Sequence, residues 1–197
     1  ADHAELLEQY PYPFKIVARY TIDSEKVAVS YEVTNEGTED MPFFVGGHPG
    51  FKCPLDEGES YDDYELRFEQ REATELCTAV PSTGLIDVEH RSKNPMIGQN
   101  LPLTHELFDF AETIFDVLES RVVTLTKKTE DKGVRLTFPD MPYLIVWSKP
   151  EGDFVAVEPR GGLSTCSDED DVLEHKRGCL VAKPGETVTR GFEIEIL

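Results

Sequence analysis

The segment Thr187-Val188-Thr189-Arg190-Gly191-Phe192-Glu193-Ile194-Glu195-Ile196 carries the clearest structural pattern in this sequence of 197 residues. From Phe192 onward, apolar residues and glutamates alternate strictly, and threonines occupy the polar phase before it. Successive side chains of a β-strand point to opposite faces, so this alternation predicts a strand with one face on a core and one face in water.

Shorter runs of apolar and β-branched residues, broken by Gly, Pro, Asn and Asp, recur along the chain. Two of them, 14–20 and 27–33, flank the turn-forming residues Asp23-Ser24-Glu25 and predict a hairpin. We expect further strands at 64–69, 122–126, 134–138, 143–148, 154–158 and 179–182. Strands at this spacing predict an all-β fold with antiparallel sheets packed as a sandwich, in one domain spanning 1–197.

Helix signals are few. Thr104 is a candidate N-cap for a short helix through Phe108, with an apolar continuation to Leu118. The acidic run 167–171 is interpreted as a solvated loop in preference to a metal site.

The formal net charge of -20 restricts the partners of the protein. Phosphate backbones and anionic lipids repel such a chain, and no Lys/Arg cluster interrupts the acidity, so nucleic acid and membranes are not expected partners. No apolar run approaches the roughly 20 residues of a membrane span, and the N-terminus lacks a signal-peptide pattern. We therefore predict a cytoplasmic protein.

The four cysteines are widely separated and form no C-x-x-C pair: Cys53, Cys77, Cys166 and Cys179. This spacing predicts neither a zinc site nor a disulfide scaffold. We expect free thiols in a reducing compartment.

His48 occupies an unusual local setting, between Gly46-Gly47 and Pro49, directly after the apolar run 43–45. Glycines permit backbone conformations closed to other residues and proline fixes the chain that follows, so such a turn can project an imidazole at a fixed angle. With an unperturbed pKa of about 6.5, an imidazole can exchange a proton near neutrality. A histidine that only satisfies the backbone groups of its own turn is an equally good interpretation at this point.

Glu158 is the second candidate, because it ends the apolar run 154–157 and precedes Pro159-Arg160. A carboxylate at the end of a buried strand is costly to desolvate unless it is paired or used in catalysis. A simple ion pair with Arg160 would explain it without catalysis. Two proton-handling groups at strand ends would suit general acid–base chemistry.

Other catalytic patterns, such as G-x-S-x-G, H-E-x-x-H, a P-loop or G-x-G-x-x-G, do not occur. The remaining histidines stand among polar residues and are expected at the surface: His3, His90, His105 and His175. Aromatic residues could stack on sugar faces, but as members of strands they are more often part of the core; examples are Tyr10, Tyr12, Phe14, Phe51 and Trp147.

Several stretches in order along the chain suggest a relationship. They are Tyr12-Pro13-Phe14, Pro42-Phe43-Phe44-Val45-Gly46-Gly47-His48-Pro49-Gly50-Phe51, Leu107-Phe108, Ile114-Phe115, Ser120-Arg121, Trp147-Ser148-Lys149-Pro150, Val157-Glu158-Pro159 and Pro184-Gly185-Glu186. Their order and spacing resemble the galactose mutarotase (aldose 1-epimerase) family, in particular its LacX-like branch, and the resemblance covers the C-terminal two-thirds of that family's length.

The resemblance implies a galactose mutarotase-like supersandwich whose concave face holds a sugar. By position, His48 is similar to the family's general acid, which protonates the ring oxygen of an aldohexose, and Glu158 to its general base. The implied reaction interconverts α and β anomers without a nucleotide cofactor or, usually, a metal. Two alternatives remain open here: a noncatalytic carbohydrate-binding sandwich, and a hexose-6-phosphate epimerase-like enzyme, for which Arg160 is the only local support.

The sequence departs from the family pattern in three respects. The family is longer at the N-terminus, so we expect a domain without those strands, with exposed sheet edges that favour self-association or association with a missing N-terminal segment. Arg160 stands where an aromatic residue often follows the Glu-Pro pair. Ala111 aligns with a sugar-binding Asp, and the neighbouring Glu112 is our candidate for substrate binding.

Overall fold

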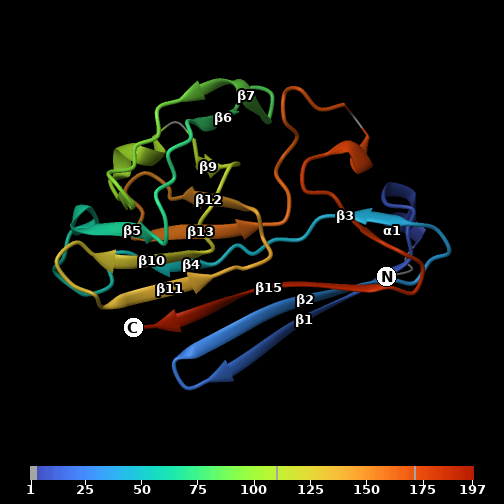
Figure 1. The fold of residues 1–197 in the computed structure, drawn as a ribbon, viewed down its shortest axis with the longest axis horizontal. Coiled ribbons are helices and arrows are strands. Elements are labelled where there is room, and N and C mark those ends of the chain that lie inside the picture. Colours follow the sequence, from blue (N-terminus) through green and yellow to red (C-terminus); the bar gives the residue numbers. More distant parts are fainter. Residues whose placement is uncertain (1–3, 110, 171) are drawn as a thin grey trace.

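A computed structural model describes residues 4–109, 111–170 and 172–197. Within these residues the chain is mostly β, with antiparallel strand pairs throughout the sheets (Figure 1). The larger sheet has the order β1-β2-β15-β11-β10-β5-β8, formed by Phe14–Asp23, Lys26–Asn35, Thr187–Ile196, Gly133–Thr137, Val122–Lys127, Tyr64–Phe68 and Asn100–Pro102. The smaller has the order β4-β13-β12-β9-β6-β7, formed by Gly50–Lys52, Phe154–Arg160, Tyr143–Trp147, Thr113–Phe115, Leu76–Val80 and Leu85–Ser92.

The remaining elements are short. A two-stranded sheet joins β3 (Met41–Phe43) to β14 (Leu180–Ala182), and α1 (Ala4–Gln9) precedes the first strand. Short 3-10 helices cover Tyr61–Asp63, His105–Phe108 and Leu173–His175. No helix in the described part of the chain is long and apolar enough to cross a membrane.

The predicted strands are confirmed, including the hairpin, in which Phe14 lies opposite Asn35 and Asp23 opposite Lys26. The predicted helix is wrong beyond Phe108: residues 105–108 form a 3-10 helix, and Thr113–Phe115 is the buried strand β9, paired with β12. As a strand, all three of these residues are buried and paired within the sheet. Phe110, within the predicted helix, lies outside the described residues.

The main core lies between the two large sheets and collects alternate residues from each. Leu144 and Val146 of β12 and Val155 and Val157 of β13 face it from the smaller sheet, and all four are at most 1% exposed. Each such side chain contributes roughly 1.5–3 kcal/mol through burial. The intervening residues of β12 and β13 therefore point to the outer face of the smaller sheet, which becomes important below.

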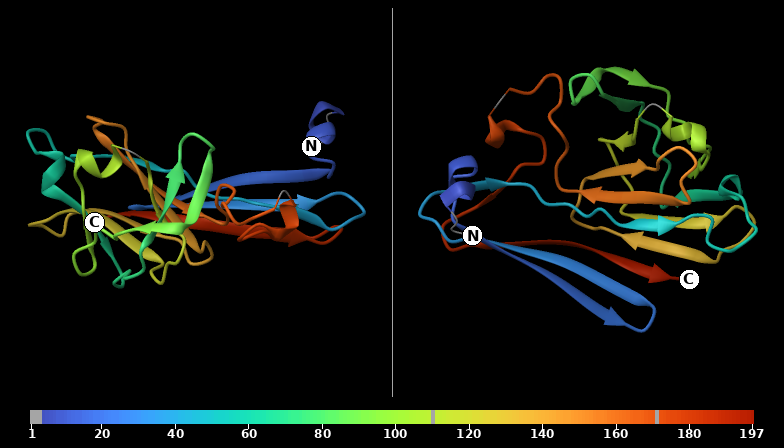
Figure 2. Two further views of the ribbon diagram at one scale, coloured as in Figure 1. Left: turned by 90° about the horizontal axis from the view of Figure 1, so that it is seen from above. Right: turned by 180° about the vertical axis from the view of Figure 1, so that it is seen from behind.

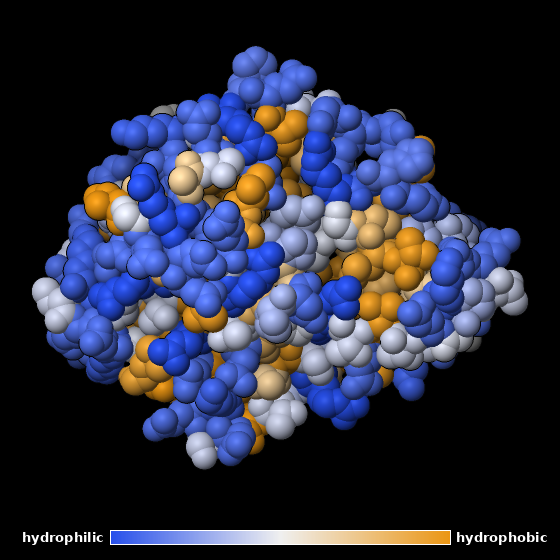
Figure 3. All heavy atoms as spheres, viewed as in Figure 1, coloured by the Kyte–Doolittle hydropathy of each residue, from blue (hydrophilic) through white to orange (hydrophobic). Residues whose placement is uncertain are grey.

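The β1–β2 hairpin extends away from the body of the molecule, with β1 at the free edge of the larger sheet (Figure 2). The apolar face of β1 is uncovered: Ile16, Tyr20 and Ile22 are 53%, 66% and 76% exposed. The apolar side of β1 is thus not buried within the described chain. A space-filling view likewise shows apolar atoms gathered in hollows of an otherwise hydrophilic face (Figure 3).

The prediction of a solvated acidic loop at 167–171 is wrong for Glu169. Its side chain is 7% exposed, and its carboxylate accepts hydrogen bonds from the backbone N–H groups of Cys166 and Arg177. Asp168 is exposed and pairs with Arg177, and Asp171 lies outside the described residues. Asp170 in turn accepts a hydrogen bond from the N–H of Val172, so three carboxylates of this loop bind neighbouring groups. All four cysteines are free, as expected.

Candidate active site

The outer face of the smaller sheet forms the floor of a cavity. Glu158 of β13 lies opposite Ile145 of β12, which in turn lies opposite Ile114 of β9. These residues share a face because paired positions on neighbouring strands point the same way. Arg160 is two residues beyond Glu158 on the same strand and therefore also points to this face.

The segment carrying His48 runs antiparallel along β13. At one end β4 pairs with the strand, with Gly50 opposite Ala156, and at the other Gly46 bridges to Arg160. Between them, the N–H of Gly47 donates to the carbonyl of Pro159 at 2.8 Å. The same register places His48 opposite Glu158.

The glycines before His48 are required by close packing. Neither has a positive φ, contrary to the conformational reason that the sequence suggested. A Cβ atom at Gly47 would stand 2.3 Å from the ring of Phe192, and one at Gly46 would stand 2.8 Å from Cδ of Arg160. Gly46 therefore lets the His48 segment lie close against β13, and Gly47 leaves room for the ring of Phe192 on β15.

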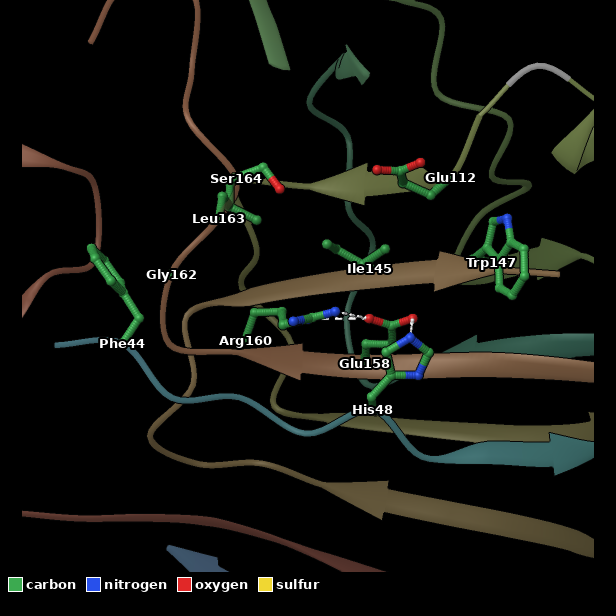
Figure 4. A pocket seen from close by; sticks show the side chains of 10 residues that line it. All are labelled: Phe44, His48, Glu112, Ile145, Trp147, Glu158, Arg160, Gly162, Leu163 and Ser164. Carbon is green, nitrogen blue, oxygen red and sulfur yellow. Dashed lines mark hydrogen bonds and ion pairs between the residues drawn. The ribbon is translucent and has the colours of Figure 1, made fainter. Parts of the chain in front are cut away.

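His48 and Glu158 meet directly, as Figure 4 shows. Nε2 of His48 lies 2.9 Å from Oε1 of Glu158, an ion-pair distance when the imidazole is protonated. The Glu158 side chain is 4% exposed, whereas that of His48 is 61% exposed. Oε2 of Glu158 accepts hydrogen bonds from Nε of Arg160 at 3.1 Å and from Nη2 of the same residue. The ion pair that the sequence offered as an alternative explanation of Glu158 is therefore present together with the contact to His48.

The pair opens into a cavity of about 550 Å³, within the size range of small-molecule sites. Glu112 also lines it, so the structure brings together all three residues singled out from the sequence. Figure 4 shows Glu112 and Trp147 across Ile145 from the His48–Glu158 pair, with Phe44 at the other end of the cavity. Glu112 has no ion-pair or hydrogen-bond partner among the described residues.

Other lining residues were not selected from the sequence as site residues: Phe44, Ile145, Trp147, Gly162, Leu163 and Ser164. Trp147 was considered part of the core, yet it is only partly buried. Trp147 lies two residues after Ile145, on the face opposite to the buried Leu144 and Val146, but the sequence alone does not show which of the two faces opens into a cavity. The aromatic rings of Phe44 and Trp147 offer apolar surfaces suited to the C–H faces of a sugar.

The other histidines differ in their settings. His90 and His175 are exposed, as expected, and Asp87 and Asp170 raise the pKa of their respective partners through side-chain hydrogen bonds. His105 does not conform, because it is partly buried and stacks on Tyr61 with ring centroids 4.3 Å apart. His3 lies outside the described residues. In the described ranges, no cluster of three or more His, Cys, Asp or Glu is arranged to hold a metal ion.

Comparisons with known proteins agree with one another. The family model described as aldose 1-epimerase matches residues 1–194. Protein LacX of Lactococcus lactis subsp. lactis, in plasmid and chromosomal forms, is 39% identical over 197 residues, which are 99% of this chain and 66% of LacX. The chain thus spans slightly less than two-thirds of the length of these curated relatives.

Solved structures show the same architecture. A galactose mutarotase-like protein from Lactobacillus casei superposes with a TM-score of 0.86 at 28% identity, covering 100% of this chain and 67% of that one. A galactose mutarotase related enzyme from Lactobacillus acidophilus gives the same TM-score and identity, with 100% and 65% covered. At 18% identity, a galactose mutarotase-like protein from Clostridium acetobutylicum still shares the fold, with a TM-score of 0.72 over 100% of this chain and 60% of that one.

Proposed function

Since the chain belongs to the aldose 1-epimerase family, we propose that its cavity interconverts the α and β anomers of an aldohexose, with His48 as general acid and Glu158 as general base. The observation that carries this proposal is the 2.9 Å separation of His48 Nε2 and Glu158 Oε1 at the floor of a sugar-sized cavity. Groups this close to each other can reach two adjacent oxygens of one ligand, within the distances that proton transfer requires.

The anomeric hydroxyl and the ring oxygen of a pyranose are such neighbours, because both are bonded to C1. Oε1 of Glu158 removes the hydroxyl proton, C1 becomes a carbonyl carbon, and the bond from C1 to the ring oxygen breaks. The ring oxygen takes its proton from Nε2 of His48. Rotation about the C1–C2 bond and reclosure, with the two residues exchanging roles, then give the other anomer.

The buried and the exposed member of the pair each suit this scheme. Glu158 is buried and held through Oε2, so its proton-accepting oxygen has a defined position. The more exposed His48 stands at the mouth of the cavity, where it can separate from Glu158 as the sugar enters between them. Trp147 and Phe44 would hold the sugar ring, and Glu112 would accept hydrogen bonds from its hydroxyls.

The test is exchange NMR between the anomers of glucose and of galactose at equilibrium, with polarimetry of freshly dissolved α anomers as a second measurement. We expect interconversion proportional to protein concentration and faster than in the same buffer with bovine serum albumin. Binding of sugar with no acceleration would rule out the catalytic proposal and leave a carbohydrate-binding function for this chain.

A further inference from the structure

Arg160 needs an explanation, because an arginine at the floor of a sugar cavity can either pair with a side chain of the protein or bind an anionic substrate. The hydrogen bonds of Arg160 favour one of these two roles. Nε and Nη2 both donate to the same atom, Oε2 of Glu158. This leaves Oε1 of Glu158 for His48 and the cavity.

The backbone around Arg160 holds this arrangement. The residue bridges to Gly46 on one side and pairs with Tyr143 of β12 on the other. The missing side chain at Gly46 provides the space in which the arginine stem lies. A carboxylate as deeply buried as Glu158 is strongly destabilising without a compensating charge, so the guanidinium is needed in this position even without a ligand.

We propose that Arg160 is a positioning residue, which fixes Glu158 through Oε2 so that Oε1 accepts the proton, and that the cavity takes an uncharged sugar in preference to a sugar phosphate. This inference rests on the proposed function for the role of Oε1. The preference for an uncharged sugar follows separately from the charges that line the cavity.

These charged or titratable side chains are His48, Glu112, Glu158 and Arg160. Arg160 and Glu158 neutralise each other, and Glu112 adds a carboxylate without a partner among the described residues. A phosphate monoester would bring a charge of about −1.5 to −2. It would meet Glu112 and find no uncommitted arginine or lysine in the described lining. The other cation of this lining, a protonated His48, is paired with Oε1 of Glu158. Hydroxyl groups, in contrast, can donate hydrogen bonds to Glu112.

The experiment compares Arg160→Met and Arg160→Lys with Arg190→Met, a matched control on β15 outside this cavity. With glucose, we expect Arg160→Met to reduce kcat by roughly 10- to 100-fold, because a misplaced base loses its alignment, while KM stays unchanged. Arg160→Lys should recover part of the rate, since it restores the charge without the two-nitrogen contact.

A phosphate-binding role for Arg160 predicts a different result. If Arg160 binds phosphate, its loss will weaken binding of glucose 6-phosphate and leave glucose turnover at the wild-type rate, which would overturn the proposal. Urea unfolding of each variant separates these effects from a general loss of structure, and Arg160→Lys remains informative if Arg160→Met does not fold.

Ligand-observed NMR makes the substrate preference independent of turnover. We expect saturation transfer from the wild-type protein to glucose and galactose but not to glucose 6-phosphate at equal concentrations. Preferential binding of the phosphate would overturn the proposal. Binding of glucose without accelerated anomer exchange would instead remove the proposed function and leave the stated preference for an uncharged sugar intact.

Discussion

Gly46 and Arg160 face each other across an antiparallel bridge, and a Cβ atom at Gly46 would stand 2.8 Å from Cδ of Arg160. The Gly46→Ala substitution should therefore displace the guanidinium from Glu158 and slow anomer exchange by about 10-fold or more. Gly50→Ala is the control, because a Cβ atom there meets nothing within 4 Å. Equal rates in the two variants would show that the arginine stem adjusts without moving its head group.

The two residues that meet at 2.9 Å should be individually necessary. His48→Gln and Glu158→Gln each remove a proton-transferring group while keeping a similar shape, and we expect each to reduce the exchange rate by about 10²-fold or more. His90→Gln provides the control, since His90 is exposed and pairs with Asp87 away from the cavity. Wild-type rates in both site variants would exclude the assigned roles.

The ion pair between Arg91 and Asp116 should stabilise the fold in a pH-dependent way. Burial acts to raise the pKa of Asp116, but the hydrogen bonds and charge of Arg91 outweigh it and hold this pKa below its usual value. Stability from this group is therefore present above the unfolded-state pKa of about 3.9 and is lost as the pH falls through the lower folded-state value.

Replacing Arg91 by Met should lower the free energy of unfolding at pH 7 by about 1–3 kcal/mol, because it leaves a largely buried acceptor without its partner. The difference from wild type, measured by urea unfolding, should shrink as Asp116 becomes protonated. Arg19→Met, which removes a more exposed pair with Glu32, should lower the free energy of unfolding by less than Arg91→Met does. A pH-independent difference would contradict the electrostatic explanation.

The uncovered strand β1 should make the chain self-associate. Within the described residues, no strand pairs with the outer edge of β1 at 16–22, so this edge can pair with another chain and bury the exposed side chains of Ile16, Tyr20 and Ile22. We expect concentration-dependent association in sedimentation experiments and a dissociation constant about tenfold or more higher in Tyr20→Lys. Thr21→Lys, on the opposite face of the same strand, places the charge away from the apolar surface. A monomer at all concentrations would exclude association through β1.

The long strands could be predicted because their patterns extend over enough residues to define a period. Residues 187–196 and the 14–33 region are examples: both form strands, and the hairpin pairs as predicted. Three-residue strands such as β4 and β9 have no measurable period and exist because a neighbouring strand pairs with them. For this reason the apolar residues of β9 were assigned to a helix.

The candidate site likewise combines features that the sequence indicates with features that only the structure shows. His48 and Glu158 could each be selected from their local sequence, but their contact depends on the register between the 46–52 segment and β13, more than 100 residues later. Trp147 and Phe44 could not be distinguished from core residues, since only the assembled sheet shows which face opens into the cavity. The reason for Gly46 and Gly47 was likewise visible only in the packing.

The cavity floor is made of paired strands, whereas Glu112 and Ser164 stand just outside β9 and β13 on connecting segments. Such segments tolerate sequence change more readily than the sheet beneath them. In the proposed function, reaction rate and sugar selectivity thus depend on separable parts of the molecule. A library randomised at these two connecting positions could be screened for a new sugar while His48, Glu158 and Arg160 keep the geometry of the parent protein.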